Sequence, residues 1–361
     1  MTSGCESLAD LEPQGLAMTY WLDPVPVGAP YPVSIRFVGQ RVGATRKRGP
    51  LDRFSVVESL QVVPGSGPVA ITARVNQIAA GDWQITARPI SRGQRNGTAR
   101  STSVRVASLA TASGSGRTTY APIARNLAPG AHLGAWPALV GFGLAVALVV
   151  QALLVSHLQL RIPPVLLVSA AASLVGLVGA KLYHAAGHYL TGERGALQLL
   201  SGTCIQGFLL GAVLALLVGT RVAQLPLWSL LDVTAPGLMF GMAVGRYGCF
   251  FGGCCVGRPT ASRWGLWSSD RRVGVRRIPT QLLESTLALL VGIAALLAHS
   301  LAAPRPAGVV FVGSIAAYTL GRQLLFPLRD RPRRPAWRRV LVLALCAGIV
   351  VADVAVAVVT G

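Results

Sequence analysis

Residues 245–260 read Gly245-Arg246-Tyr247-Gly248-Cys249-Phe250-Phe251-Gly252-Gly253-Cys254-Cys255-Val256-Gly257-Arg258-Pro259-Thr260 and end an apolar segment that begins near Leu227. An arginine thus stands where the segment is still expected to lie in lipid, and glycines surround it. Arginine at membrane depth is costly unless it faces a polar cavity or an anionic partner. Glycines allow sharp turns and let a ligand approach the backbone closely. The stretch therefore marks a candidate functional site.

Composition places most of the chain in a membrane. Of its 361 residues, 52% are hydrophobic and 13% are charged, whereas a soluble domain carries about 25% charged residues. The formal net charge of +20 comes mainly from arginine. A nucleic-acid-binding protein would carry the same sign of charge, but apolar runs of about 20 residues favour anionic lipid. We therefore expect membrane lipids, and no nucleic acid, among the partners.

The first part of the chain has a different pattern. Short runs of alternating apolar and polar residues, such as Val33–Val38 and Val69–Val75, are separated by turn-rich pieces such as Pro64–Pro68. Period-two alternation at this spacing predicts a small β-sandwich. We interpret residues 1–106 as an accessory sandwich-like domain without a signal peptide, since no apolar core follows a basic start.

A linker is expected between this domain and the membrane part. Ala107–Arg117 is rich in Ser, Thr, Ala and Gly, a composition typical of flexible linkers. We place the linker at residues 107–133 and the membrane domain at residues 134–361.

Seven apolar segments occupy the membrane part. Each is about long enough to cross a hydrocarbon core of about 30 Å, and helices satisfy every backbone group in lipid. The sequence therefore predicts a multi-pass α-helical membrane protein with seven transmembrane helices, preceded by a small all-β domain. The expected helices are Gly134–Val155, Pro164–Ala185, Leu197–Val218, Leu227–Phe251, Thr280–Ala302, Ala307–Leu328 and Val340–Val359.

Two intramembrane arginines suggest the chemistry of the site. Arg246 and Arg322 both lie toward the arginine-rich ends of their helices, and each is next to a glycine. Two guanidinium groups close together would bind a phosphate or carboxylate through paired hydrogen bonds. The alternative is that each arginine pairs with Asp232, Glu284 or a carbonyl and only holds helices together.

Three clustered cysteines raise the question of a metal or redox site. Cys249, Cys254 and Cys255 show no Cys-x-x-Cys spacing and have no histidine nearby, unlike common metal sites. Adjacent Cys254 and Cys255 are also expected to point in different directions. We interpret the three as small packing residues and expect neither a metal nor a cofactor.

The membrane part, from about Gly134 to Asp330, resembles the bacterial prolipoprotein diacylglyceryl transferases. Gly245–Gly257 is similar to the family signature GRIGNFxNGExxG and to its GRIGCFxxGCCYGKPT variant, and Pro279–Glu284 matches PTQLYE. Four further segments resemble other motifs of the family and follow in the family's order, namely Gly179–His184, Ser201–Gly211, Leu231–Leu238 and Tyr318–Arg322. Six motifs in the family's order form a specific signal.

The resemblance implies transfer of the diacylglyceryl group of phosphatidylglycerol onto the cysteine thiol of a lipoprotein precursor, in the bacterial plasma (inner) membrane. Arg246 and Arg322 would stabilise the leaving phosphate, and Gln206 stands where the family has a histidine often proposed as the base. Glutamine accepts no proton at neutral pH. The implied substrate-binding residues are Tyr318, Gly245, Gly248, Cys249, Gly257, Arg258, Gln281 and Glu284.

Gln206 keeps a second hypothesis open, in which a non-catalytic paralogue binds anionic lipid or a lipoprotein. A small transporter is a third, although no clear internal repeat supports it. Orientation also has two interpretations. The arginine-rich loops after Phe251 and Leu328 place the N-terminal domain in the cytoplasm by the positive-inside rule, whereas the family resemblance places it outside.

Overall fold

The chain forms two compact units. The computed structural model describes residues 12–43, 49–90, 109–157, 161–190, 202, 204–300, 306–330 and 336–360. Unit 1 comprises Met1–Trp136, Tyr247–Leu282 and Leu328–Arg331, and unit 2 comprises Pro137–Arg246, Leu283–Pro327 and Pro332–Gly361. The signature stretch is therefore divided, because Arg246 ends a segment of unit 2 and the cysteines that follow belong to unit 1.

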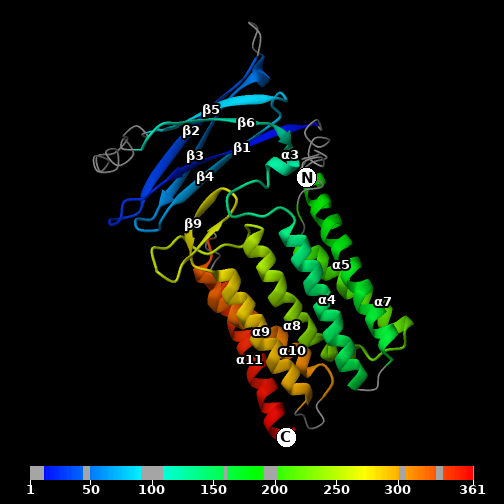
Figure 1. Ribbon diagram of the computed structural model, residues 1–361. Coiled ribbons are helices and arrows are strands. Elements are labelled where there is room, and N and C mark those ends of the chain that lie inside the picture. Colours follow the sequence, from blue (N-terminus) through cyan, green and yellow to red (C-terminus); the bar gives the residue numbers. More distant parts are fainter. Residues whose placement is uncertain are drawn as a thin grey trace. The chain divides into compact units, whose positions relative to one another are not determined.

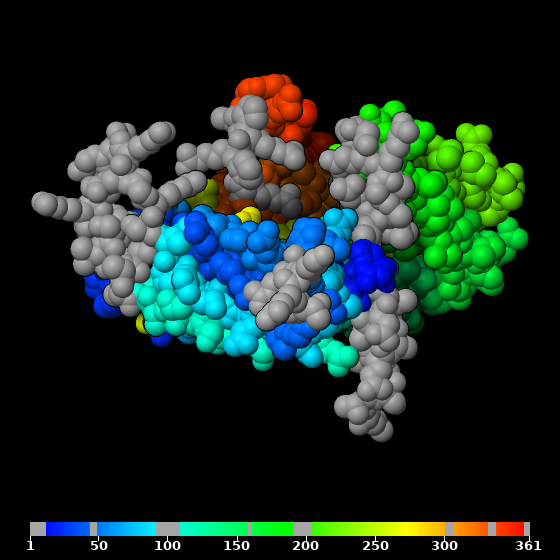
Figure 2. Space-filling view, turned by 90° about the horizontal axis from the view of Figure 1, so that it is seen from above, coloured from blue at the N-terminus to red at the C-terminus, as the bar shows by residue number. Residues whose placement is uncertain are grey.

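Two antiparallel β-sheets form most of unit 1 (Figure 1), with strand orders β7-β1-β4-β9-β8 and β3-β2-β5-β6. Their strands are β1 (Gln14–Leu22), β2 (Tyr31–Arg41), β3 (Arg53–Val62), β4 (Val69–Asn76), β5 (Asp82–Pro89), β6 (Ala112–Arg117), β7 (Thr119–Tyr120), β8 (Leu266–Ser269) and β9 (Val273–Arg277). Alternate residues of both sheets, such as Met18, Ile35 and Phe37, meet in one hydrophobic core. This is the packing of a sandwich, and it confirms the expected β domain. Figure 2 shows one face of this domain, coloured blue to cyan.

The strand content of unit 1 extends beyond the predicted domain. Residues 112–117, which we expected within the linker, form β6, which pairs with β5 from Asp82↔Arg117 to Ala87↔Ala112. β6 is mostly exposed, so its pairing depends on backbone hydrogen bonds that need no apolar side chains, and alternation could not reveal it. Residues 1–11 and 91–108 lie outside the described part of the chain.

A hairpin from the middle of the sequence also joins this sheet. Strands β8 and β9 lie between two membrane helices in sequence, and β9 pairs with β4 at Ala70↔Gly274 and Ile71↔Val273. The run Val273-Gly274-Val275-Arg276-Arg277 is short and arginine-rich, so its sequence does not predict a strand.

Among the described residues, seven apolar helices fit the predicted arrangement roughly. They are α4 (Ala135–His157), α5 (Ile162–Leu190), α7 (Ile205–Val222), α8 (Leu227–Phe251), α9 (Thr280–Ser300), α10 (Val309–Leu325) and α11 (Ala336–Thr360). Within the described residues, 6 helices are long and apolar enough to cross a membrane, and α7 is a shorter apolar helix. The protein is therefore a multi-pass membrane protein. The start predicted for the third helix, Leu197, lies outside the described residues.

Small residues bring the helices of unit 2 close together. A Cβ atom on Gly179 of α5 would lie 2.5 Å from the carbonyl oxygen of Gly207 on α7, and one on Gly143 of α4 would lie 2.5 Å from that of Gly241 on α8. Such contacts are typical of membrane helices, whose association depends on close backbone packing.

Asp232 of α8 caps helix α10. Its Oδ2 accepts a hydrogen bond from the backbone N–H of Gly308 at 2.6 Å, and its Oδ1 accepts one from Phe311 at 2.9 Å. Gly308 is the N-cap residue of α10 and has no side chain to satisfy these amides. Asp232 therefore has a structural role, and the described partners of its carboxylate are helix amides.

Candidate functional site

Arg246 joins three helices at the arginine-bearing end of unit 2. Its Nη2 donates a hydrogen bond to the hydroxyl oxygen of Tyr318 on α10 at 2.9 Å. Its Nη1 forms an ion pair with Oε2 of Glu284 on α9 at 3.1 Å. The Glu284 side chain is fully buried and that of Arg246 is 14% exposed. The structure thus brings together one predicted catalytic residue and two predicted substrate-binding residues.

The two contacts of Arg246 have different consequences. Glu284 offsets the charge of a largely buried guanidinium, which would otherwise be costly in lipid. Tyr318 accepts from Arg246, so its own O–H remains available to donate to another acceptor. A phosphate oxygen beside Tyr318 would accept a strengthened hydrogen bond from its hydroxyl, since the arginine polarises that group.

Arg322 follows Tyr318 by four residues on α10, so the two side chains lie on the same face of the helix. Arg322 is half-buried. The spacing places a second arginine one helical turn from Tyr318, whose hydroxyl Arg246 contacts. Among the described residues, a Cβ atom on Gly245 would meet only Val140 Cγ2, at 3.9 Å. Packing therefore does not require glycine beside Arg246.

Gln206 lies in the first turn of α7, where its side chain is exposed. Its Oε1 accepts a hydrogen bond from the Cys204 thiol at 2.6 Å. This contact is local to the N-terminus of α7. The partner is a thiol that donates to Gln206, so the contact does not supply a base.

The cysteine turn, residues 249–257, belongs to unit 1. The N–H of Cys254 donates to the carbonyl oxygen of Cys249 at 3.0 Å, while Gly253 and Cys255 have φ angles of 67° and 56°. With these left-handed φ angles, successive side chains no longer point to opposite sides, as they would in an extended chain. As a result, the sulfur atoms of Cys249, Cys254 and Cys255 all lie within 4.8 Å of one another. The expectation that Cys254 and Cys255 point apart is wrong.

Hydrogen bonding to the thiols of Cys249 and Cys255, together with burial, raises the pKa of Cys254 above its ordinary value. The thiol therefore stays protonated at neutral pH.

Residues at the start of α9 hold the cysteine turn. Gln281 Nε2 donates to the carbonyl oxygen of Cys254 at 2.9 Å, and Thr280 Oγ1 donates to that of Cys255 at 3.3 Å. A Cβ atom on Gly257 would lie 2.1 Å from the carbonyl oxygen of Ile278. Gln281 and Gly257, both predicted to bind substrate, thus have packing roles in this unit. Gly248, another predicted binding residue, is buried, and its carbonyl oxygen accepts the Gly252 N–H at 2.8 Å.

Arg258 is exposed, and its backbone anchors the chain after the cysteine turn. Its N–H donates to the carbonyl oxygen of Leu328 at 2.9 Å, and its own carbonyl oxygen accepts the N–H of Ile278 at 3.0 Å. Its guanidinium Nε reaches the carbonyl oxygen of Arg329 at 3.4 Å.

Arg277 is an organising residue that the sequence interpretation missed. Its side chain is 2% exposed and forms ion pairs with Asp330 at 2.7 Å and Asp270 at 3.1 Å. Its Nη1 also donates to the carbonyl oxygen of Gly257 at 3.1 Å. The one available signal was its position two residues before the Pro279–Glu284 motif.

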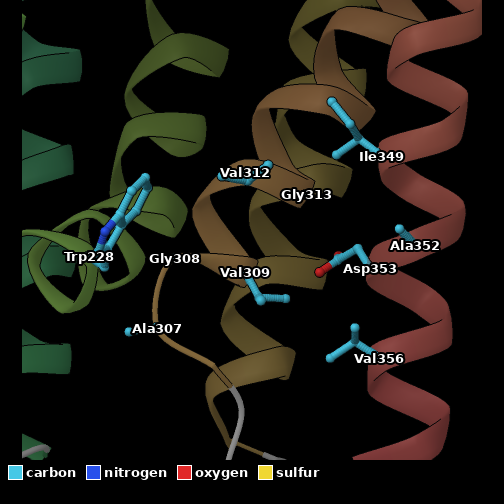
Figure 3. A pocket seen from close by; sticks show the side chains of 10 residues that line it. All are labelled: Trp228, Ala307, Gly308, Val309, Val312, Gly313, Ile349, Ala352, Asp353 and Val356. Atoms are coloured by element: carbon cyan, nitrogen blue, oxygen red, sulfur yellow. The ribbon is translucent and has the colours of Figure 1, made fainter.

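A cavity of about 370 Å³ lies elsewhere in unit 2. Figure 3 shows Asp353 of α11 pointing toward Gly313 of α10, with apolar side chains around them. The cavity also includes Trp228, in the first turn of α8, and at 1.5 Å per residue this end lies about 27 Å along the helix from Arg246. It is therefore separate from the Arg246 cluster.

The sequence pattern of the prolipoprotein diacylglyceryl transferase family matches residues 122–360, which include every helix that carries the Arg246 cluster. The chain belongs to this family. The match begins after β7 and includes the β8–β9 hairpin, so most of the β domain lies outside it.

Curated relatives support this assignment over shorter ranges. The chain is 36% identical over 138 residues to the phosphatidylglycerol–prolipoprotein diacylglyceryl transferase of Nostoc sp., which covers 36% of this chain and 49% of the relative. It is 33% identical over 154 residues to that of Dehalococcoides mccartyi, covering 41% of this chain and 58% of the relative. The chain thus spans about half the length of the curated relatives it matches.

Proposed function

We propose that this protein transfers the diacylglyceryl group of phosphatidylglycerol to the cysteine thiol of a lipoprotein precursor. The observation that carries the proposal is the contact of Arg246 with both Tyr318 and Glu284, inside a chain of this family. The proposed substrates are those named for the relatives.

The phosphodiester of the lipid is the group that the cluster suits. Arg246 and Arg322 supply positive charge, and the Tyr318 hydroxyl can donate between them. Arginine binds phosphate oxygens through parallel N–H donors in a fixed plane. Gly245 leaves the backbone beside Arg246 free of a side chain, so the headgroup can approach closely.

The proposed reaction forms one bond and breaks one bond. The precursor's sulfur attacks the glycerol carbon that carries the phosphate, a C–S bond forms, and the C–O bond to phosphate breaks. Glycerol-1-phosphate leaves with the bonding electron pair, and the thiol proton is released. Negative charge develops on the departing phosphate, where preorganised donors lower the barrier most. The attacking species is the thiolate.

The proton of the precursor thiol has no acceptor at Gln206, because an amide does not take up a proton at neutral pH. We propose that Gln206 acts only as a hydrogen-bonding residue at the N-terminus of α7. Catalysis by this chain then depends on phosphate stabilisation more than on a base at this position.

Transfer by the purified protein is the test. The full chain in detergent is given phosphatidylglycerol labelled in its acyl chains, together with a precursor peptide, and the mass gain of the peptide is measured. We expect diacylglyceryl addition that is lost in Arg246→Ala and Arg322→Ala and retained in Arg221→Ala, on the short loop end of α7. Absence of transfer by folded wild-type protein, or full transfer by both arginine variants, would sink the proposal.

A second candidate is a non-catalytic protein that binds anionic lipid or a lipoprotein, and Gln206 in place of a base favours it. It predicts lipid binding that requires Arg246 and Arg322 but gives no modified peptide. Robust turnover rules it out.

We place the protein in the bacterial plasma membrane. Protease treatment of intact spheroplasts tests the orientation. Cleavage of the β domain before lysis supports the outward orientation implied by the family, whereas protection supports the charge distribution of the loops.

A further inference from the structure

The geometry points to a metal site in the cysteine turn, formed by Cys249, Cys254 and Cys255, which binds one soft divalent ion such as Zn²⁺ through three thiolates. None of the three cysteines forms a disulfide bond, and their sulfur atoms lie within 4.8 Å of one another. Zn–S bonds of about 2.3 Å in tetrahedral geometry place two sulfurs about 3.8 Å apart. Small rotations about the Cα–Cβ bonds bring the three sulfurs to that spacing.

The backbone holds the three ligands in place before any ion binds. Cys249 lies in the last turn of α8, and its carbonyl oxygen accepts the Cys254 N–H. The carbonyl oxygens of Cys254 and Cys255 are held by Gln281 and Thr280, whose side chains are 1% and 0% exposed. Cys255 keeps a left-handed φ of 56°, which is costly for a residue with a side chain. Such preorganisation favours ion binding, because little entropy remains to be lost.

The surroundings suit a negatively charged complex. Binding converts three thiols and M²⁺ into an M(SR)₃⁻ centre and releases three protons, so no oxidant or reductant is required. Arg271 lies against the turn, with its Nε donating to the Gly252 carbonyl oxygen at 2.8 Å, so a cation stands beside the negatively charged complex.

Three protein ligands leave one coordination position open for water or another small ligand. Gln281, which contacts the turn, carries a buried acceptor with no described partner. Its Oε1 is buried and has no hydrogen-bond partner among the described residues, while the Nε2 of the same amide contacts the turn. A buried acceptor of this kind can take a hydrogen bond from a metal-bound water. The sequence alone favoured packing residues, because it could not show the left-handed backbone.

Titration of the full-length reduced protein with Co²⁺ tests the site independently of lipid transfer. We expect one Co²⁺ per chain with sulfur-to-cobalt charge-transfer absorption, displacement by Zn²⁺, and tighter binding as pH rises. Cys249→Ser, Cys254→Ser and Cys255→Ser should each weaken binding by more than about 100-fold, beyond the loss typical of outer-sphere changes. Cys346→Ser, in α11, is the matched control and should bind as the wild type does.

A second measurement requires no variant. In wild-type protein at alkaline pH, where the Cys254 thiol ionises, Zn²⁺ should protect Cys249, Cys254 and Cys255 from iodoacetamide, and a chelator should restore their alkylation, as read by peptide mass spectrometry. The proposal is overturned if reduced wild-type protein binds no Co²⁺ and Zn²⁺ protects none of the three. It is also overturned if Cys346→Ser loses the ion as the turn variants do. Because neither readout involves phosphatidylglycerol, failure here leaves the proposed transfer activity separately testable.

Discussion

Nη2 of Arg246 donates a hydrogen bond to the hydroxyl oxygen of Tyr318 at 2.9 Å, so α8 and α10 are linked through the two residues that the family signature and the Tyr-x-x-x-Arg motif contribute. The two residues are 72 positions apart in the chain, and the fold makes them one cluster.

Substitutions in this pair should separate charge from geometry. Arg246→Lys keeps the charge but loses the planar fork, and we expect lipid transfer to fall by at least about 100-fold. Tyr318→Phe removes one neutral donor, and we expect a loss of about 10-fold. Initial rates of peptide modification measure both. Tyr189→Phe, at an exposed position of α5, is the control, and an equal loss there would contradict the assignment.

Glu284→Gln should destabilise the protein, because the Arg246 guanidinium would lose the charge that offsets it. Removing one partner of a buried pair costs about 3–5 kcal/mol, and we expect the lower part of this range, since Arg246 is 14% exposed and glutamine retains an acceptor. Thermal unfolding in detergent measures the change. Glu58→Gln breaks the more exposed pair with Arg272 at 2.8 Å and should cost less than about 1 kcal/mol. Equal effects would show that burial of the pair is not decisive.

Asp232→Ala should loosen the N-terminus of α10, because two backbone amides lose their acceptor. Loss of a helix cap costs about 1–2 kcal/mol. We expect a lower unfolding temperature and faster amide hydrogen exchange at Gly308 and Phe311. Asp232→Asn keeps one acceptor and should fall between Ala and wild type. Unchanged exchange at both amides would refute the capping role.

Two glycine substitutions should have opposite signatures. Gly257→Ala drives a Cβ atom to 2.1 Å from the carbonyl oxygen of Ile278, and we expect a loss of stability of about 1–3 kcal/mol. Gly245→Ala meets only Val140 among the described residues, at 3.9 Å, so stability should hold or rise by up to about 1 kcal/mol. Transfer should nevertheless fall in Gly245→Ala if the lipid headgroup approaches there. Unfolding temperature and transfer rate, measured together, distinguish the two.

The pKa of Cys254 predicts a pH dependence for the metal-free protein. Hydrogen bonding to Cys249 and Cys255 and burial raise it above its ordinary value of 9.0. The folded state therefore favours the protonated thiol, and this stabilisation is complete below pH 9 and is lost as pH rises above that value. We expect slow alkylation of Cys254 at pH 8 that accelerates only in alkaline solution. Rapid alkylation at pH 8 would contradict the raised pKa.

The sequence determined much of this protein by local pattern. Runs of about 20 apolar residues predicted the seven helices, because lipid leaves a helix little alternative, and α8 has the bounds that we expected, Leu227–Phe251. Period-two alternation predicted the sandwich. The ordered motifs pointed to Arg246, Tyr318 and Glu284 as members of one site, and the structure brings these three together.

Only the tertiary structure decided which side chains and strands come together when they are far apart in sequence or are brought together by a backbone turn. β9 joins β4 through hydrogen bonds across some 200 residues, and Arg277 gains its partners Asp270 and Asp330 from separate loops. The three cysteines converge because Cys255 adopts a left-handed φ, a conformation that neighbouring side chains and not local propensity select. The periodicity of the sequence indicates which face of a helix or strand is apolar. It does not indicate which distant segments of the chain come into contact in the folded protein.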